Sequence, residues 1–400
     1  MNILTLSWRY LWARPLAALL NLILLAVGLA SLTFVLLSGA QLERAFERDL
    51  AGIDVVVGAK GSPMQLILSG VFHIDVPPGN VALSDVLALQ EHPQVAQVIP
   101  LSMGDSYRGF RIVGTTPEYP RHYAAVLAQG EMWTGAMQVV LGQRVAAATS
   151  LRVGARFHGS HGLGQGGKAH DDDPYQVVGL LASCACVLDR LILTATESVW
   201  QVHENATAAS DGARKTPAAE PEVTMALVRY RTPLAAVSFP RFVNSGTPMQ
   251  AAAPALEVTR LLQMVGVGTD VLRAFAGVLL LTAGLGVFIA LWNAVRERQT
   301  DLAMLRMLGA PPMRVSLLVM SEALWLALLA CALGLPAGHA LTALAGYALE
   351  AQRSLVLSGW TWTPLEAVVP LLAGAIAVLA ASLPAFRAYS VDVSQLLESR

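Results

Sequence analysis

Four long stretches of the chain are almost entirely apolar, and they divide it into segments of different character. A helix that crosses a hydrocarbon core of about 30 Å needs about 20 consecutive apolar residues. Each stretch is long enough, so the pattern predicts four transmembrane helices, one before and three after a large intervening segment. The predicted spans are residues 16–40, 271–295, 315–346 and 367–386.

The segment between the first two spans, residues 41–270, has a different pattern. Short runs of β-forming residues alternate with glycine and proline, as in a folded domain with many turns. Helical patterns lie between these runs at residues 83–91 and 233–243. We therefore expect a large mixed α+β extracytoplasmic domain. The β-like runs are residues 53–57, 95–101, 110–113, 138–141, 176–181, 191–194 and 223–230.

The first span also has features of a secretory signal peptide. Arg9 and Arg14 precede it, and Ser38-Gly39-Ala40 resembles a cleavage site. Its apolar stretch is longer than the 7–15 or so residues usual for a signal-peptide core. We therefore expect an uncleaved anchor.

The orientation of the spans follows from their short flanks, because lysine and arginine there mark the cytoplasmic side. Arginines lie in the lead-in segment 1–15, the loop 296–314 and the tail 387–400, whereas the loop 347–366 is poor in them. This distribution predicts a multi-pass membrane protein. Both termini and the 296–314 loop are cytoplasmic, and residues 41–270 are extracytoplasmic.

Composition agrees with a membrane protein and excludes some other classes. Only 14% of the residues are charged and 54% are hydrophobic, whereas soluble domains carry about 25% charged residues. Lys+Arg number 27 and Asp+Glu 28, a net charge of −1, so no bulk positive field favours nucleic acid as a partner. Cys184 and Cys186 could chelate a soft metal, form a disulfide in an oxidising compartment, or serve as packing residues.

Four motifs in a fixed order resemble a known family. The loop after the second span reads VRERQTDLAMLRMLGA (residues 295–310), and the N-terminus reads LSWRYLWARP (residues 6–15). The tail carries PAFRA (residues 384–388), and the outer segment carries VLDRLIL (residues 187–193). These motifs resemble the ABC transporter permeases of the macrolide-exporter, lipoprotein-releasing and cell-division superfamily (MacB/LolC/FtsX, type VII). Asp301 stands where that family usually has glutamate.

The resemblance implies a function. Such permeases work as dimers, of two copies or with a paralogue, and a separate cytoplasmic ABC ATPase supplies the motion. They move, extract or activate an extracytoplasmic substrate. The resemblance also implies a location in the bacterial inner membrane, with the outer domain in the periplasm and a periplasmic protein as a candidate further partner.

The loop pattern also predicts a docking helix by itself. Apolar residues recur at helical spacing among arginines, as in a short amphipathic helix that binds a groove of a partner protein. An interfacial helix lying on membrane lipid is the alternative. The expected ATPase-coupling residues are Arg296, Arg298, Asp301, Leu302, Leu305, Arg306, Leu308 and Gly309.

The chain shows no pattern typical of catalytic residues, and we expect no enzymatic activity of its own. Residues 162–169 approach a phosphate loop, but Ala169 replaces the Ser/Thr that would hold Mg²⁺ and no apolar strand precedes the glycines. We therefore expect this chain to bind no cofactor, with ATP and Mg²⁺ in the partner subunit.

A second interpretation of the function is based on metal binding. One loop combines side chains that can bind Zn²⁺, namely His158, His161, His170 and Asp171. A zinc-related metal-handling permease is therefore an alternative function. A membrane-anchored periplasmic enzyme or sensor is the alternative of another class.

Two ionisable residues, Glu322 and His339, lie inside the third predicted span, and such residues are functional candidates because lipid disfavours them. We expect each to bond a neighbouring helix, with a proton relay between them as the alternative. The apolar stretch 60–72 is either domain core or a contact surface for a cargo or outer partner.

Overall fold

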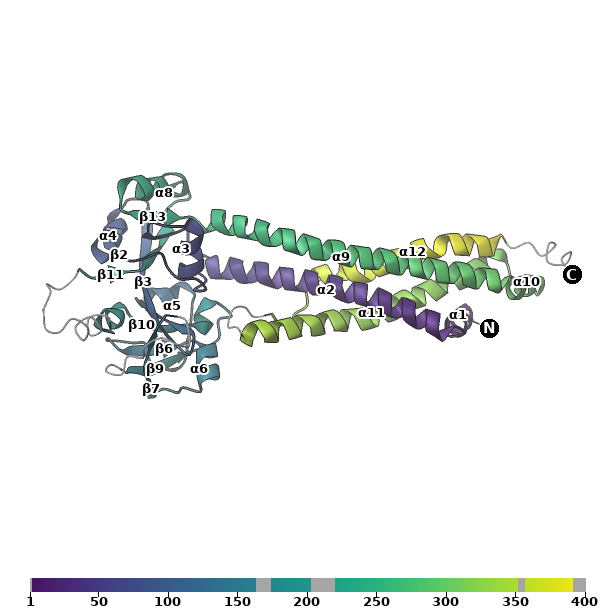
Figure 1. Cartoon of the computed structure of the whole chain (residues 1–400), viewed down its shortest axis with the longest axis horizontal. Helices are drawn as coiled ribbons and strands as arrows, with labels where there is room; N and C mark the ends of the chain where they lie inside the picture. Colours follow the sequence, from purple (N-terminus) through teal and green to yellow (C-terminus); the bar gives the residue numbers. More distant parts are fainter. Residues whose placement is uncertain (1, 163–173, 203–219, 352–356, 391–400) are drawn as a thin grey trace. The chain divides into compact units, whose positions relative to one another are not determined.

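The chain folds into two compact units. In the computed structural model, the helical unit comprises Met1–Glu43 and Met264–Arg400, and the α+β unit comprises Arg44–Gln263. Two helices, α2 (Pro15–Leu50) and α9 (Pro254–Glu297), each begin in one unit and end in the other (Figure 1). The structure describes residues 2–162, 174–202, 220–351 and 357–390.

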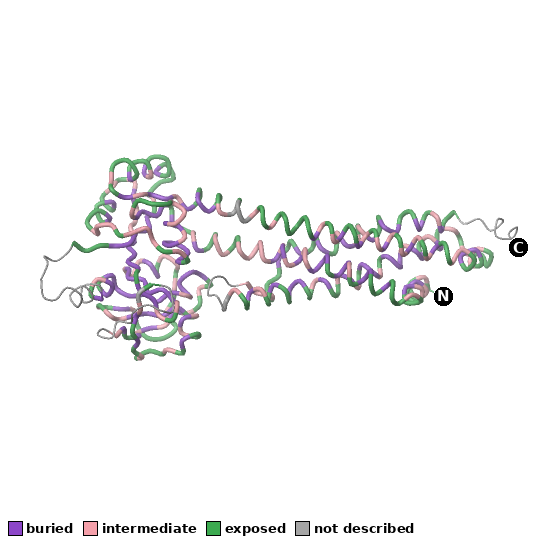
Figure 2. The backbone as a smooth tube through the Cα atoms, in the orientation of Figure 1, coloured by how far each residue is buried: buried purple, intermediate pink, exposed green. Residues whose placement is uncertain are grey.

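Four helices of the described chain are long and apolar enough to cross a membrane, as the hydropathy pattern predicts. They extend beyond the predicted spans, because the helical hydrogen-bond pattern continues past the end of the apolar stretch. Much of α9 is exposed (Figure 2). In its most apolar part, only 28% of the residues are buried. The four helices are Pro15–Leu50, Pro254–Glu297, Pro312–Leu349 and Pro364–Tyr389.

Small residues bring the helices of the helical unit close together. A Cβ built on Gly334 would lie 2.9 Å from the carbonyl oxygen of Ala26, and one on Gly338 would lie 2.5 Å from Cβ of Thr33. Glycines spaced by four allow this backbone approach between apolar helices. Besides α2 and α9, the unit contains α1 (Ile3–Leu11), α10 (Gln299–Met307), α11 (Pro312–Ala351), η3 (Pro364–Ala367) and α12 (Val368–Tyr389).

A single large mixed sheet organises the α+β unit. Its main path runs β13-β1-β12-β3-β4-β10-β6-β9-β5, with β7 paired to β9 and β8 to β3, and β11 pairs with β2 separately. β4 and β10 are parallel, as are β6 and β9, and the other pairs are antiparallel. The strands are β1 (Val55–Ala59), β2 (Val81–Ala82), β3 (Val95–Tyr107), β4 (Phe110–Thr115), β5 (Leu127–Gly130), β6 (Gln138–Leu141), β7 (Arg156–Phe157), β8 (Ser160–His161), β9 (Tyr175–Leu181), β10 (Ile192–Ala195), β11 (Glu222–Val223), β12 (Met225–Tyr230) and β13 (Met249–Ala252).

Both faces of the strands β1, β4, β6 and β10 are buried, which explains why these strands read as nearly continuous apolar runs. Successive side chains of a strand point to opposite faces. Val56 of β1 accordingly packs in one core cluster and Val55 and Val57 in another. Helices cover the sheet (Figure 1): α3 (Pro63–Gly70), α4 (Leu83–Ala88), η1 (Leu89–Glu91), α5 (Glu118–His122), α6 (Gln143–Thr149), η2 (Val187–Arg190) and α8 (Ala235–Gly246).

The predicted secondary structure of the outer domain is confirmed element by element. Each of the seven β-like runs overlaps a strand, and both helical patterns overlap helices. The apolar stretch 60–72 is core, because Leu66, Ile67, Val71 and Phe72 are at most 2% exposed. The contact surface suggested for that stretch is therefore wrong.

Candidate coupling site in the helical unit

Arg298 interrupts the helix at the junction between α9 and α10. Its φ of −98° and ψ of 16° depart from helical values, so the chain ends one helix at Glu297 and starts the next at Gln299. The turn directs the Arg298 side chain inward, where it is 14% exposed.

The Arg298 guanidinium joins three elements that are distant in the sequence. It donates to a carboxylate oxygen of Glu322 in α11 (3.2 Å) and to the main-chain carbonyl of Tyr10 in α1 (2.8 Å). Its central carbon also lies 4.5 Å from the centre of the Tyr10 ring, in a cation–π contact. The Glu322 side chain is 7% exposed, so this ion pair is largely shielded from water and salt. We call Arg298, Glu322 and Tyr10 the junction cluster.

The electrostatic surroundings of Tyr10 follow from this packing. Burial raises the pKa of its phenol, the carboxylate of Asp301 raises it further, and the Arg298 guanidinium opposes both. Tyr10 therefore stays protonated and neutral at physiological pH.

A cavity of about 170 Å³ opens beside the junction cluster. Its wall includes Arg14 and Glu297, which form an ion pair at the start of α2 and the end of α9. Their side chains are 40% and 53% exposed, so water screens this second pair far more than the first.

The short helix α10 presents apolar residues on two sides. Leu302 and Ala303 are buried, and Leu305 is partly buried against the core of the helical unit. On the other side, Met304 and Met307 are 50% and 58% exposed, and Leu308 is 85% exposed. The outward apolar surface of α10, which we call the α10 face, consists of Met304, Met307 and Leu308.

Gly309 follows the end of α10. Its φ of +91° lies in the left-handed region that glycine adopts without a steric penalty. The amide of Ala310 then donates back to the carbonyl of Leu305 (3.0 Å), which closes the helix end.

The remaining predicted coupling residues lie on both sides of the junction between α9 and α10. Arg296, in the last turn of α9, and Asp301, in the first turn of α10, are exposed. The positive end of the α10 helix dipole favours a carboxylate at the position of Asp301. Arg306 is partly buried. Their role in binding an ATPase stays a prediction.

Glu322 and His339 do not form a relay pair. They are separated by 17 positions of one helix, which places them about 25 Å apart at 1.5 Å per residue. The imidazole of His339 instead bonds the Glu366 carboxylate through Nε2 (2.9 Å) and the Gly359 carbonyl through Nδ1 (2.8 Å). Glu366 also closes a capping box with Thr363 at η3, so His339 fixes the segment before α12.

The proposed metal ligands do not come together within the described residues. His158 is exposed and His161 lies in β8, whereas His170 and Asp171 lie outside the described residues. The described part of the chain contains no group of three His, Cys, Asp or Glu residues that could hold a metal ion. The metal-handling alternative stays a prediction.

Sequence reasoning missed two members of these polar clusters. Tyr10 contributes a main-chain carbonyl and a ring face, which no residue pattern marks. Glu366 lay in a predicted outer loop, although the pattern Thr363-Pro-Leu-Glu366 is a recognisable capping signature.

Two family models match the chain. The FtsX-like permease C-terminal model matches residues 273–393, which include α10, and the MacB-like periplasmic core domain model matches residues 18–220, half of the chain.

The similar curated proteins are longer than this chain. The pyoverdine export ATP-binding/permease protein PvdT of Pseudomonas entomophila is 28% identical over 190 residues, which are 44% of this chain and 27% of that protein. PvdT of Pseudomonas fluorescens is 23% identical over 328 residues, 76% of this chain and 46% of that protein. The chain therefore spans less than half the length of these relatives.

Two solved structures align with part of the chain. The periplasmic region of MacB from Actinobacillus actinomycetemcomitans aligns with a TM-score of 0.34 and 13% identity, covering 54% of this chain and 95% of that one. The extracellular domain of the noncanonic ABC-type transporter YknZ from Gram-positive bacteria aligns with a TM-score of 0.30 and 15% identity, covering 49% and 98%. With both family models matched in the order found here, the chain belongs to the ABC transporter permeases that combine an FtsX-like C-terminal part with a MacB-like periplasmic core domain.

Proposed function

We propose that this permease receives ATP-driven motion on α10 from a cytoplasmic ABC ATPase on a separate chain and transmits it to the α+β unit. In this proposal the chain lies in the bacterial inner membrane with both termini in the cytoplasm. One span precedes the periplasmic domain and three follow it. ATP and Mg²⁺ bind in the ATPase, and a second copy or a paralogue completes the membrane part.

The observation that carries the proposal is the exposed apolar α10 face directly beside the buried junction cluster. Apolar side chains on an exposed short helix are costly in water unless a partner or lipid covers them. The inner side of the same helix is fixed to α11 through Leu302 and the core of the helical unit. A push on the α10 face would therefore reach Arg298 and the end of α9.

The connection between α10 and the α+β unit is made by helix α9 itself. It runs from Pro254, within the α+β unit, to Glu297, one residue before Arg298. Displacement of a stiff helix can move a distant domain, because packed secondary-structure elements move as rigid bodies. The permease would thereby move, extract or activate a periplasmic substrate.

A photo-crosslinking amino acid at Leu308 tests the docking surface in native membranes. We expect irradiation to yield an adduct that mass spectrometry identifies as a protein with an ATP-binding cassette. The matched control places the same probe at Val237 of α8, which is similarly exposed at 78% but lies in the α+β unit. Adducts to lipid alone at Leu308, or equal ATPase adducts at both sites, would contradict the proposal.

A further inference from the structure

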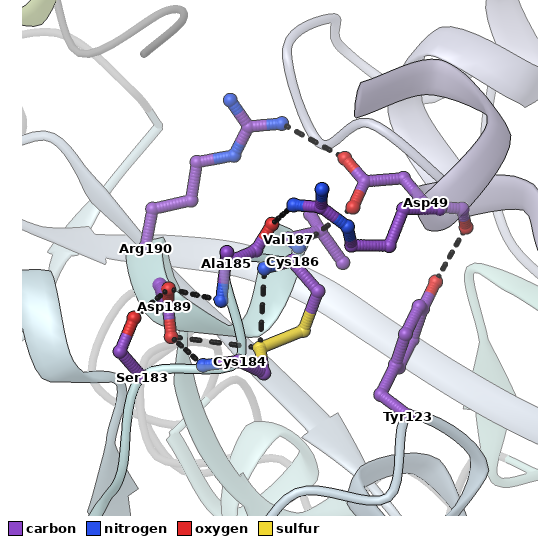
Figure 3. Close-up of a disulfide and its surroundings, with 10 residues drawn as sticks. Asp49, Tyr123, Ser183, Cys184, Ala185, Cys186, Val187, Asp189 and Arg190 are labelled. Carbon is purple, nitrogen blue, oxygen red and sulfur yellow. Dashed lines mark hydrogen bonds and ion pairs between the residues drawn. A yellow bond between two sulfur atoms is a disulfide. The ribbon is translucent and has the colours of Figure 1, made fainter. Parts of the chain in front are cut away.

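A disulfide joins Cys184 and Cys186 in the segment between β9 and η2 (Figure 3). Only Ala185 separates the two cysteines, so the bond closes a very small ring. A cross-link removes less entropy from the unfolded chain when the loop that it closes is smaller. This disulfide therefore contributes little to global stability, and its presence needs another explanation.

The ring combines an unfavourable backbone conformation with access to solvent. Ala185 has a φ of 51°, in the left-handed region that residues with a Cβ disfavour. Ala185 is exposed and Cys184 partly exposed, whereas Cys186 is buried. Disulfides that are strained or exposed are reduced more readily than buried structural ones. Cys184 is therefore the more accessible of the two cysteines to an incoming thiolate.

One buried carboxylate holds the ring in place. Asp189 accepts hydrogen bonds from the Ser183 hydroxyl (2.8 Å) and from the main-chain amides of Cys184 (3.0 Å) and Ala185 (2.9 Å) (Figure 3). These bonds make residues 183–190 one ordered segment, which we call the latch loop.

The latch loop holds the last turn of α2, in the part of that helix that belongs to the α+β unit. Arg48 donates a hydrogen bond to the Ala185 carbonyl. The amide of Val187 donates to the Asp49 carboxylate (2.9 Å), and the Arg190 guanidinium lies 3.9 Å from the same carboxylate. Two of these three contacts use a residue inside the disulfide ring or directly next to it.

We propose that Cys184–Cys186 is a thiol-exchange site whose reduction loosens the hold of the latch loop on the last turn of α2. Without the disulfide, the hydrogen bonds to Asp189 are the remaining restraint on this segment, and Ala185 can leave the left-handed conformation more readily. Its carbonyl then turns away from Arg48, and the neighbouring Val187 amide turns away from Asp49. The inference is independent of ATPase coupling, because every contact in it lies within the α+β unit.

The reductant is a thiol compound, and the reaction is ordinary thiol–disulfide exchange. A thiolate of a protein dithiol attacks the Cys184 sulfur, and the electron pair of the broken bond goes to the Cys186 sulfur, which takes up a proton. The second thiolate of the donor then attacks the mixed disulfide and displaces Cys184 as a thiolate, which is protonated. The donor leaves as a disulfide, so two electrons have passed to the chain. A monothiol such as glutathione forms the mixed disulfide on Cys184.

The first experiment asks whether and where the bond opens. The purified full-length protein is treated under native conditions with reduced thioredoxin or with glutathione, alkylated and analysed by mass spectrometry. We expect thioredoxin to expose both thiols and glutathione to form its adduct on Cys184. A bond that opens only in denaturant refutes the site, and an adduct on Cys186 refutes the assigned direction of attack.

The second experiment measures the hold on α2 by amide hydrogen exchange. Reduction should speed exchange in residues 45–51 and at Val187 by about tenfold, the size of effect expected from losing one or two hydrogen bonds, while β12 stays protected. The variant Cys184→Ser/Cys186→Ser should exchange rapidly without any thiol and show no further response. The control Cys331→Ser, which removes the free cysteine of α11, should respond like the wild type. Unchanged exchange in the reduced wild-type protein refutes the latch, whether or not the serine variant folds.

Discussion

The junction cluster gives a prediction whose magnitude can be worked out from burial. Arg298→Met leaves the Glu322 carboxylate, 7% exposed, without its cation, and Glu322→Leu leaves the guanidinium without its anion. Removing one partner of a buried ion pair costs about 3–5 kcal/mol, because the remaining charge is uncompensated. The double variant removes both charges and loses mainly the bond to the Tyr10 carbonyl, about 1–2 kcal/mol. The coupling energy between the two positions should therefore be about 4 kcal/mol or more.

A double-mutant cycle measures this coupling. The free energy of unfolding of each variant is obtained in mixed detergent micelles by titration with a denaturing detergent, followed by tryptophan fluorescence. Arg14→Met is the matched control, because the Arg14–Glu297 pair is 40% and 53% exposed and exposed pairs contribute about 0–1 kcal/mol. A double variant whose loss equals the sum of the two single losses, or a control that loses as much as Arg298→Met, would refute the reasoning.

Two further variants test local features. Gly309→Ala should destabilise the end of α10 by about 1–2 kcal/mol, because its φ of +91° is left-handed and no neighbouring atom lies within 4 Å of the new Cβ; hydrogen exchange of α10 measures this, and no change would mean that the turn relaxes freely. Burial holds the pKa of the His73 imidazole well below its ordinary value, and nearby Arg111 lowers it further. Below a pH of about 6.5 the unfolded chain therefore takes up a proton that the folded α+β unit does not, and stability falls by up to about 1.4 kcal/mol per pH unit. Thermal unfolding midpoints between neutral and mildly acidic pH should show this loss, and His73→Gln should reduce it.

The overall architecture was predictable because its signals are local. A charge-free run of sufficient length defines a candidate span wherever it occurs, and β1 (Val55–Ala59) and β12 (Met225–Tyr230) are short apolar runs bounded by turn residues. These patterns require no knowledge of which segments meet in space. The two compact units and their strands could therefore be read from residue order alone.

The partners of the polar residues were not predictable in the same way. Arg298 bonds the carbonyl of Tyr10, 288 positions earlier, and main-chain atoms carry no sequence signal. The inner and outer sides of α10 were also ambiguous, because apolar residues occur on both. Leu305 was predicted as a contact for the ATPase, yet it packs partly against the helical core, and Met304 takes the exposed position. Only tertiary packing decides which side of a nine-residue helix faces inward.

The positions of proline distinguish the helices that would transmit motion from those that would not. α11 and α12 contain Pro336 and Pro384 within the helix, whereas α2 and α9 have proline only at their first residue. Proline removes a main-chain hydrogen bond and bends a helix. Because α9 has no internal proline, it is suited to transmit motion from α10 to the α+β unit. Gly268→Pro should interrupt α9 at a cost of about 3 kcal/mol, and the ATP-dependent change in protease sensitivity of the α+β unit should then disappear in membranes that also contain the ATPase. Gly268→Ala, whose Cβ meets no atom within 4 Å, should keep that change. A proline variant that responds to ATP like the alanine variant would show that the motion does not travel through α9.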